Sequence, residues 1–358
     1  MKKLIALTLA LAMSLSLAAC GNGSAPSGGN AGGAASGGGN AGGGNAGGGS
    51  GAAVTLQIGF ENSSSEPIGQ GLAKWQELLA AENTGLEIAL YPDSQLGGKS
   101  SLIDSMTLGE GVCTLADGAF YADYGVNDFG IVFGPFLFDS WEDCWKLVDS
   151  DWYAEQCAQL ESKGLHIIGS NWIYGDRHTL TTKKVEKVED LSGMKIRVPT
   201  NQIQTQGFNV LGATATGMDL GEVYTALSTG TIDGAENPLA TLYGRSLQEV
   251  AKYLILDGHV KNFTTWVCSA DWYNSLTAEQ QTALTETCKA AGEYNNQLVM
   301  EADSDYLQKM KDAGVEVVDP SDEVLAGFKT KAQAFYDMGS TFGWSDGLYD
   351  TVMAAMGK

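Results

Sequence analysis

The stretch VTLQIGFENSSSEPIGQGLAKWQELLAAENTGLEIALYP, residues 54–92, decides the fold class. Residues 54–60 alternate in polarity and are rich in β-branched side chains, which predicts a strand. Apolar residues then recur at helical spacing through 68–85, where a glycine ends the segment. A second apolar run, 86–92, stops at a proline and predicts another strand. The order strand, helix, strand is typical of an α/β sheet with parallel strands.

The same alternation continues after residue 92. A helix predicted through 101–108 gives way at Gly109 to a strand at 112–118. Open α/β sheets bind their ligands at the carboxyl ends of the strands. We therefore expect polar residues that directly follow these strands to face a ligand.

The second half of the chain repeats this plan. Strands are predicted at 165–172, 194–200 and 231–238, and helices at 205–212 and 219–230. Asp219 can cap the last of these helices, with Glu222 as its capping-box partner. Segments 105–118 and 226–238 both run helix, glycine, short strand and polar edge. The repetition predicts two lobes of the same α/β type, with the chain crossing between them.

A long helix is predicted at 277–314. It begins with Thr277 as a cap, contains no proline and ends at Gly314. At about 1.5 Å per residue it would exceed roughly 50 Å. A helix of this length can brace both lobes.

Composition narrows the classes of partner. The 358 residues suit two domains, and 44% of them are hydrophobic. The formal charge of −22 excludes nucleic acid and anionic lipid headgroups as favourable partners for the surface. An anionic ligand would therefore depend on a few local cations, and the chain contains only three arginines: Arg177, Arg197 and Arg245.

The first residues have the features of an export signal. Lys2 and Lys3 precede an apolar run, which ends in LAAC at 17–20. This pattern resembles a bacterial lipobox and predicts a lipoprotein signal peptide over 1–19 with lipidation at Cys20; the alternative is an ordinary secretory signal with a chance cysteine. Residues 20–53 are mostly glycine, asparagine and alanine, which predicts a flexible tether. We therefore expect an extracytoplasmic protein, anchored through its lipid to the outer face of the cell membrane.

Cysteine and histidine spacing gives no metal or cofactor signature. Five cysteines follow Cys20, without CxxC or histidine-rich spacing. We expect no metal and no cofactor. A disulfide and buried free thiols remain equally compatible with the sequence.

Arg197 lies in the predicted strand MKIRVPT, near its carboxyl end. Its planar guanidinium matches a carboxylate with two parallel hydrogen bonds. The alternative is a structural ion pair with one of the 43 acidic residues.

Several blocks together resemble the solute-binding proteins of TRAP transporters, of the DctP type. The blocks are LYPDSQLGGKSSLIDSMTLGEGV (90–112), PFLF (135–138), GDRHTLTTKKVEKVEDLSGMKIRVPT (175–200) and the segment from GATATGMDL to LILDGH (212–259). The resemblance extends over most of 54–340. It implies a two-lobed periplasmic-binding-protein fold, with lobe 1 made of 54–174 and 263–302 and lobe 2 of 175–262 and 303–358.

The resemblance also implies a function. Such proteins capture a small organic acid, a sugar acid or a dicarboxylate, and deliver it to a TRAP-type membrane permease without catalysis. A ligand-sensing subunit with the same cleft is an alternative. A secreted α/β hydrolase is a weaker one, because GxSxG and HExxH motifs are missing from the sequence.

Carried over by motif, the ligand-binding residues are Arg197 as the carboxylate clamp, Arg177 as a second guanidinium, Asn237, Glu61, Asp117, Lys99 and Trp172. Glu61 and Asp117 would repel a second carboxylate but can accept hydrogen bonds from hydroxyls. This favours a hydroxylated acid. Trp172, with Tyr174, could cover an apolar sugar face, or could pack in the core.

Overall fold

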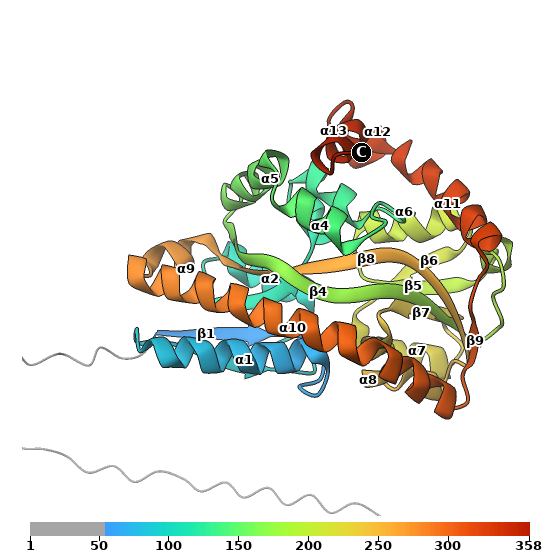
Figure 1. Cartoon of the computed structure of the whole chain (residues 1–358), viewed down its shortest axis with the longest axis horizontal. Helices are drawn as coiled ribbons and strands as arrows, with labels where there is room; N and C mark the ends of the chain where they lie inside the picture. Colours follow the sequence, from blue (N-terminus) through green and yellow to red (C-terminus); the bar gives the residue numbers. More distant parts are fainter. Residues whose placement is uncertain (1–53) are drawn as a thin grey trace, which may run out of the picture. The chain divides into compact units, whose positions relative to one another are not determined.

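One nine-stranded sheet runs through residues 54–358, the part of the chain that the computed structural model describes (Figure 1). The predicted signal peptide (1–19), the lipidation site Cys20 and the tether (20–53) lie outside the described residues. The strands are β1 (Val54–Gly59), β2 (Leu86–Tyr91), β3 (Val112–Ala116), β4 (Leu165–Thr181), β5 (Lys195–Val198), β6 (Thr214–Gly217), β7 (Gly234–Asn237), β8 (Tyr253–Ser269) and β9 (Glu316–Val318).

The strand order explains how two lobes share this sheet. The order is β2-β1-β3-β8-β4-β7-β5-β6, with β9 paired to β8. Strands β1, β2 and β3 are mutually parallel at one end, and β5, β6 and β7 are parallel at the other. The 17-residue strands β4 and β8 pair antiparallel between them. The fold is therefore a two-lobed α/β architecture in which β4 and β8 connect the lobes.

Helices cover both faces of the sheet (Figure 1). They are α1 (Pro67–Glu82), α2 (Lys99–Thr107), α3 (Gly118–Asp123), α4 (Trp141–Val148), α5 (Asp151–Glu161), α6 (Gln202–Leu211), α7 (Val223–Ser228), α8 (Leu239–Gly244), α9 (Ala270–Ser275), α10 (Ala278–Asp312), α11 (Asp322–Tyr336), α12 (Gly339–Phe342) and α13 (Leu348–Ala355). Short 3₁₀ turns lie at Asn127–Phe133, Val188–Leu191, Leu220–Glu222 and Leu247–Glu249.

The order of elements predicted for residues 54–118 is confirmed, but two elements predicted for the second half of the chain differ in extent or type. The strand expected at 165–172 continues to Thr181 because β8 pairs with it along its whole length. The helix expected at 219–230 is a 3₁₀ turn followed by the shorter α7, and Asp219 makes no capping hydrogen bond. Its carboxylate instead lies against Gly98, where a Cβ atom would be 2.6 Å from Oδ2.

Helix α10 confirms the predicted brace. Thr277 caps it through a hydrogen bond from the backbone N–H of Gln280, and the helix packs on α1 and β4 as well as on α8 (Figure 1). No helix among residues 54–358 has the length and apolar character needed to cross a membrane.

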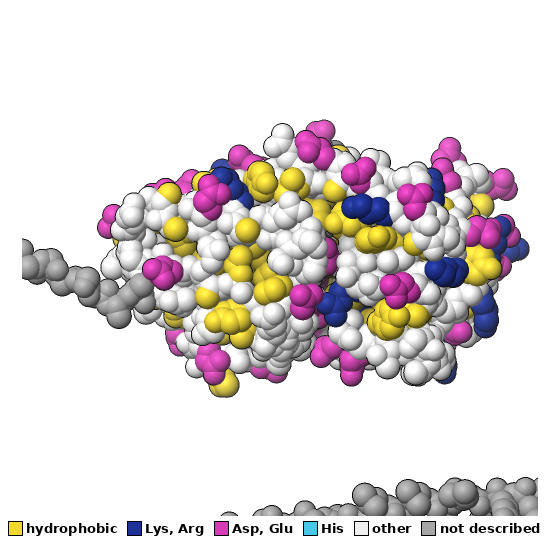
Figure 2. Space-filling model, turned by 90° about the horizontal axis from the view of Figure 1, so that it is seen from below, with side chains coloured by type: hydrophobic (Ala, Val, Ile, Leu, Met, Phe, Trp, Pro, Cys, Tyr) yellow, Lys and Arg dark blue, Asp and Glu magenta, His cyan; other side chains and the backbone are white. Residues whose placement is uncertain are grey.

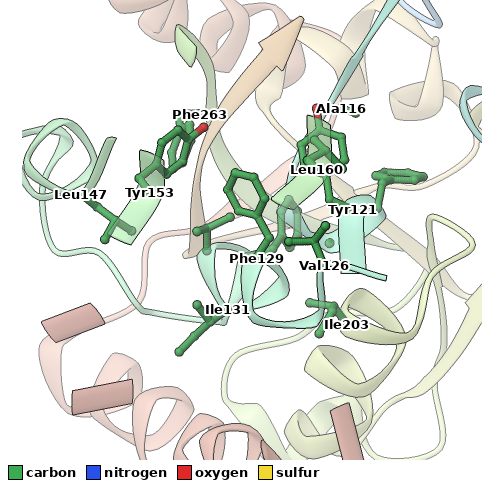
Figure 3. Close-up of a cluster of buried hydrophobic side chains, with 14 of the residues drawn as sticks. Ala116, Tyr121, Val126, Phe129, Ile131, Leu147, Tyr153, Leu160, Ile203 and Phe263 are labelled. Atoms are coloured by element: carbon green, nitrogen blue, oxygen red, sulfur yellow. The ribbon is translucent and has the colours of Figure 1, made fainter. Parts of the chain in front are cut away.

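The C-terminal helices do not follow the predicted lobe assignment. Phe335, Phe342 and Val352 belong to a core cluster with Tyr121 and Phe129 of the predicted lobe 1, part of which Figure 3 shows. This region therefore does not pack as part of lobe 2 alone, because its apolar side chains share one buried cluster with those of α3 and the following 3₁₀ turn, and α13 contacts α4 and α5. The remaining lobe boundaries stay a prediction.

Candidate ligand-binding site

A polar cavity lies between the two lobes, with about 360 Å³ of space between the atoms, partly open to solvent. Its lining consists of Glu61, Lys99, Leu115, Asp117, Tyr174, Arg177, Arg197, Pro199, Gln204, Leu220, Asn237, Asn262 and Thr264. Six of the seven predicted ligand-binding residues are therefore brought together, all except Trp172.

Strand ends position most of these side chains. Glu61 follows β1 by two residues, Asp117 directly follows β3, and Asn237 is the last residue of β7. Carboxyl ends of parallel strands meet at one edge of a sheet, which is why residues far apart in the sequence converge here. The connecting strands contribute from the side: Arg177 from β4, and Asn262 with Thr264 from β8.

Arg197 is a buried guanidinium without a carboxylate partner. It is 2% exposed, and its Nε and Nη2 atoms donate to the carbonyl oxygen of Met218 at 2.9 and 2.7 Å. No acidic side chain of residues 54–358 lies within 4.0 Å of it. Burial lowers the pKa of Arg197, opposed by the charges of Glu61 and Glu236, yet a guanidinium remains charged. Its Nη1 atom is left for a ligand.

Arg177 has a different environment. Its Nε and Nη2 atoms donate to the two carboxylate oxygens of Glu236 at 2.6 and 2.8 Å, and Nη1 donates to Asn262 Oδ1 at 3.0 Å. Glu236 also contacts His259 Nε2 at 3.2 Å, and Asp257 lies 3.1 Å from His259 Nδ1. The predicted second guanidinium therefore lines the cavity, but its charge is already paired.

The pKa values of Glu236 and His259 agree with ionisation of both groups. Burial raises the pKa of Glu236, but the charge and hydrogen bonds of Arg177 and His259 outweigh it and lower the value to about 2. Burial lowers the pKa of His259, but Asp257 and Glu236 outweigh it and raise the value to about 9. Two cations and two anions thus neutralise each other, and the network adds little net field to the cavity.

Glu61, Lys99 and Asp117 line the cavity from the first lobe. Lys99 Nζ lies 3.6 Å from Glu61 Oε2 and 4.7 Å from the ring centre of Phe120. Asp117 Oδ1 accepts a hydrogen bond from the backbone N–H of Ala119 at 3.0 Å, which caps α3. Burial raises the pKa of Asp117, opposed by the charges of Lys99 and Arg177. Oxygen atoms on Glu61 and Asp117 remain available to accept hydrogen bonds from hydroxyls.

Trp172 does not contact the cavity, so its prediction as a ligand-binding residue is corrected. It is fully buried, donates from Nε1 to the carbonyl oxygen of Cys288, and packs against Trp75 and Trp266. Register shifts lie on both sides of Trp172, between Gly169 and Trp172 and between Ile173 and Gly175, so regular alternation along β4 does not predict which face the indole occupies. Tyr174, two residues later, lines the cavity instead.

Three polar lining residues were missed by the sequence reasoning. Asn262 and Thr264 alternate with Phe263 near the end of β8, and this period of two is a usable signal for one polar face. Gln204 lies in the first turn of α6 and accepts a hydrogen bond from Asn201. Nothing in its local pattern distinguishes it from an ordinary surface glutamine.

The remaining candidates for chemistry among the described residues are metal-ligating side chains and cysteines. Among residues 54–358 no group of three or more His, Cys, Asp or Glu side chains is arranged to hold a metal ion. The five cysteines of this range are free, and four of them are buried.

Two lobes that close over an ionised polar cavity, with one guanidinium available for an anion, define a binding protein for a small solute. The comparisons with known proteins agree. The family model described as "Bacterial extracellular solute-binding protein, family 7", the DctP family, matches residues 58–341. The chain belongs to this family, whose members are solute-binding proteins.

Curated relatives and solved structures cover most of the chain. The 2,3-diketo-L-gulonate-binding periplasmic protein YiaO of Escherichia coli is 31% identical over 270 residues, which are 75% of this chain and 81% of the relative. A TRAP periplasmic solute-binding protein from Ochrobacterium anthropi with bound L-fuconate is 38% identical, with a TM-score of 0.81, covering 85% of this chain and 99% of that one. A second, from Actinobacillus succinogenes with bound L-galactonate, is 32% identical, with a TM-score of 0.79 and coverage of 85% and 99%.

Proposed function

We propose that this protein captures a hydroxylated organic acid, of the sugar-acid class, and delivers it to a TRAP-type membrane permease. The observation that carries the proposal is Arg197, a buried guanidinium that faces the cavity without an acidic partner among the described residues. The relatives with bound L-fuconate and L-galactonate support the ligand class.

The six predicted residues that line the cavity each have a role in this proposal. Arg197 binds the ligand carboxylate through Nη1, and Asn237 donates from its amide. Glu61 and Asp117 accept hydrogen bonds from hydroxyls, while Lys99 partly neutralises Glu61. Arg177 acts through its network with Glu236, which fixes the shape of the wall. A dicarboxylate would place its second charge near Glu61 or Asp117, so we expect it to bind more weakly.

The proposal assigns no catalysis to the cavity. Glu236 and His259, a buried acid and a buried base beside it, are each bound to oppositely charged partners. A sensing role with the same cleft is the second candidate; a permease that co-purifies with the protein would favour transport.

Anchoring is a separate part of the proposal. The LAAC pattern supports lipidation at Cys20, and the following tether would have a root-mean-square reach of roughly 30 Å. Cys20→Ala should release the exported protein into the medium or leave it unprocessed. A variant that fractionates with membranes as wild type does would contradict lipidation.

Thermal melting with a panel of acids tests the ligand class. The panel contains L-fuconate, L-galactonate, D-galacturonate and the dicarboxylate succinate. Ligand that binds the folded state stabilises it, by about 2.7 kcal/mol at a ligand concentration one hundred times Kd, and this raises the melting temperature. We expect the sugar acids to give the largest shifts. A larger shift with succinate would contradict the assignment of Glu61 and Asp117.

A further inference from the structure

A second set of contacts joins the lobes beside the cavity. It links helix α8, which follows β7, to the loop of residues 61–66, which follows β1. Thr241 of α8 accepts from Asn62 Nδ2 and donates to Glu66 Oε2, both at 3.1 Å. Arg245, at the end of α8, donates from Nη1 to the carbonyl oxygen of Glu61 at 3.1 Å.

Arg245 also contacts a second loop of the first lobe. Its Nη1 atom lies 3.3 Å from Asp93 Oδ1, in the loop that follows β2. Among the described residues, both hydrogen bonds of its side chain cross from the second lobe to the first. Neither hydrogen bond lies within α8, so the side chain of Arg245 joins the two lobes and does not cap its own helix.

The loop is packed closely against α8. Glu66 is 1% exposed and accepts from Asn62 Nδ2 at 2.6 Å and from the backbone N–H of Ser63 at 2.9 Å. A Cβ atom at Gly244 would lie 2.6 Å from Glu66 Oε1, so only glycine permits this approach. The contact therefore requires one particular arrangement of the two lobes.

The loop also contributes to the cavity, because Glu61 lines it. Arg245 does not line the cavity, although it donates to the backbone of Glu61. One short segment thus contacts the ligand space through its side chain and the opposite lobe through its carbonyl oxygen.

We propose that Arg245 is a positioning residue that holds the two lobes together over the bound acid. The inference rests on the proposed function. Opening of the lobes breaks the contacts of Arg245 with Glu61 and Asp93. Because the ligand can leave only when the lobes open, these contacts also oppose its release. Arg245 therefore stabilises the closed, liganded state relative to the open state, and slows dissociation without touching the ligand.

The test compares ligand binding with ligand-free stability. L-fuconate is the probe, with Kd from calorimetry and the dissociation rate from stopped-flow tryptophan fluorescence. The variants are Arg245→Ala, Arg245→Lys and Asp93→Asn, and Lys146→Ala is the control, because Lys146 pairs with Glu142 within the single helix α4. Each variant is also melted without ligand.

We expect Arg245→Ala to raise Kd about 5- to 50-fold, mostly through faster dissociation, with a ligand-free melting temperature close to wild type. Arg245→Lys should recover part of the loss, since an ammonium can still donate to the Glu61 carbonyl. Asp93→Asn should have a smaller effect, and Lys146→Ala none. An unchanged Kd in Arg245→Ala, or a loss matched by an equal fall in ligand-free stability, would overturn the proposal.

Failure of the proposed function would look different. If wild type binds neither L-fuconate nor L-galactonate, the ligand class is wrong, and Arg245 is tested without ligand. Spin labels at Thr107→Cys and Thr229→Cys, in a Cys157→Ser background, report the distance between the lobes by pulsed electron paramagnetic resonance. Arg245→Ala should reduce the population at the short distance of the closed form; a closed population of unchanged size would overturn the positioning role.

Discussion

Replacement of Arg197 by alanine should abolish most of the affinity for the acid while leaving the fold intact. The side chain is buried, faces the cavity, and has the carbonyl oxygen of Met218 as its hydrogen-bond acceptor. A ligand carboxylate would therefore be its first ionic partner. Truncating one member of such a desolvated, hydrogen-bonded charge pair costs about 2–5 kcal/mol. At about 1.4 kcal/mol per tenfold, Kd should rise roughly 30- to 3,000-fold.

The cost to folding should be much smaller. Arg197→Ala leaves the Met218 carbonyl without its donor, a loss of about 1 kcal/mol for a hydrogen bond that water can partly replace. Removal of a buried, unpaired cation offsets part of this loss. Arg197→Lys keeps the charge but not the planar fork, so it should recover only part of the affinity.

Calorimetric titration with L-fuconate, beside a melting curve for each variant, measures both quantities. Lys195→Ala is the matched control, because Lys195 begins the same strand but is exposed. If Arg197→Ala binds like wild type and melts far lower, Arg197 is a structural residue and the carboxylate assignment is wrong.

Three further predictions concern stability and redox state. The pKa of His259 is raised, so its contribution to the free energy of unfolding is complete below about pH 6.5 and is lost as the pH rises through about 9. The pKa of Glu236 is lowered, so its contribution to the free energy of unfolding is complete above about pH 4.5 and is lost as the pH falls through about 2. Urea titrations should therefore show a maximum between these limits, and His259→Gln should flatten the alkaline decline of up to about 3 kcal/mol; an unchanged decline would refute the charged network. Gly207→Ala should stabilise the folded protein by about 0.5–1 kcal/mol, because a Cβ atom there meets only Pro135, at 4.0 Å. Gly71→Ala should destabilise the folded protein, because its Cβ atom would lie 2.7 Å from Trp172. Equal shifts of the two melting temperatures would contradict this difference in packing. Mass spectrometry of non-reduced, exported protein should find the five cysteines of residues 54–358 free, and a quantitative Cys113–Cys268 bond, joining register neighbours of β3 and β8, would contradict this.

Short-range patterns were sufficient to predict where Arg197 lies. Alternation along the strand and the proline after Val198 placed the guanidinium at a carboxyl edge, and the structure places it in the cavity. Glu61 and Asp117 were found by the same reasoning, since each follows a strand that ends at that edge. Such predictions depend on residues within a few positions of one another.

Long-range partners could not be predicted in this way. The pair formed by Arg177 and Glu236 joins residues 59 positions apart, and it exists because β4 lies beside β7. The position of Trp172 depends on irregular register in β4, and a shift of one residue moves every later side chain to the other face. Neither feature leaves a mark on local composition.

The three arginines of this acidic chain all lie where the two lobes meet, and each has a different type of partner. Arg177 is paired with Glu236, Arg197 contacts a backbone carbonyl, and Arg245 contacts the opposite lobe. Because the charge of Arg177 is cancelled inside the protein, its loss would first disturb the wall of the cavity and only through that the ligand. Because Arg197 is not cancelled by an acid in the described residues, it is the group whose field an incoming carboxylate meets. A chain with a formal charge of −22 repels anions at long range, but the Debye length of about 8 Å at physiological ionic strength limits that repulsion to the surface. Under the proposed function, the unpaired guanidinium of Arg197 is therefore the group that decides whether an anion binds in the cavity.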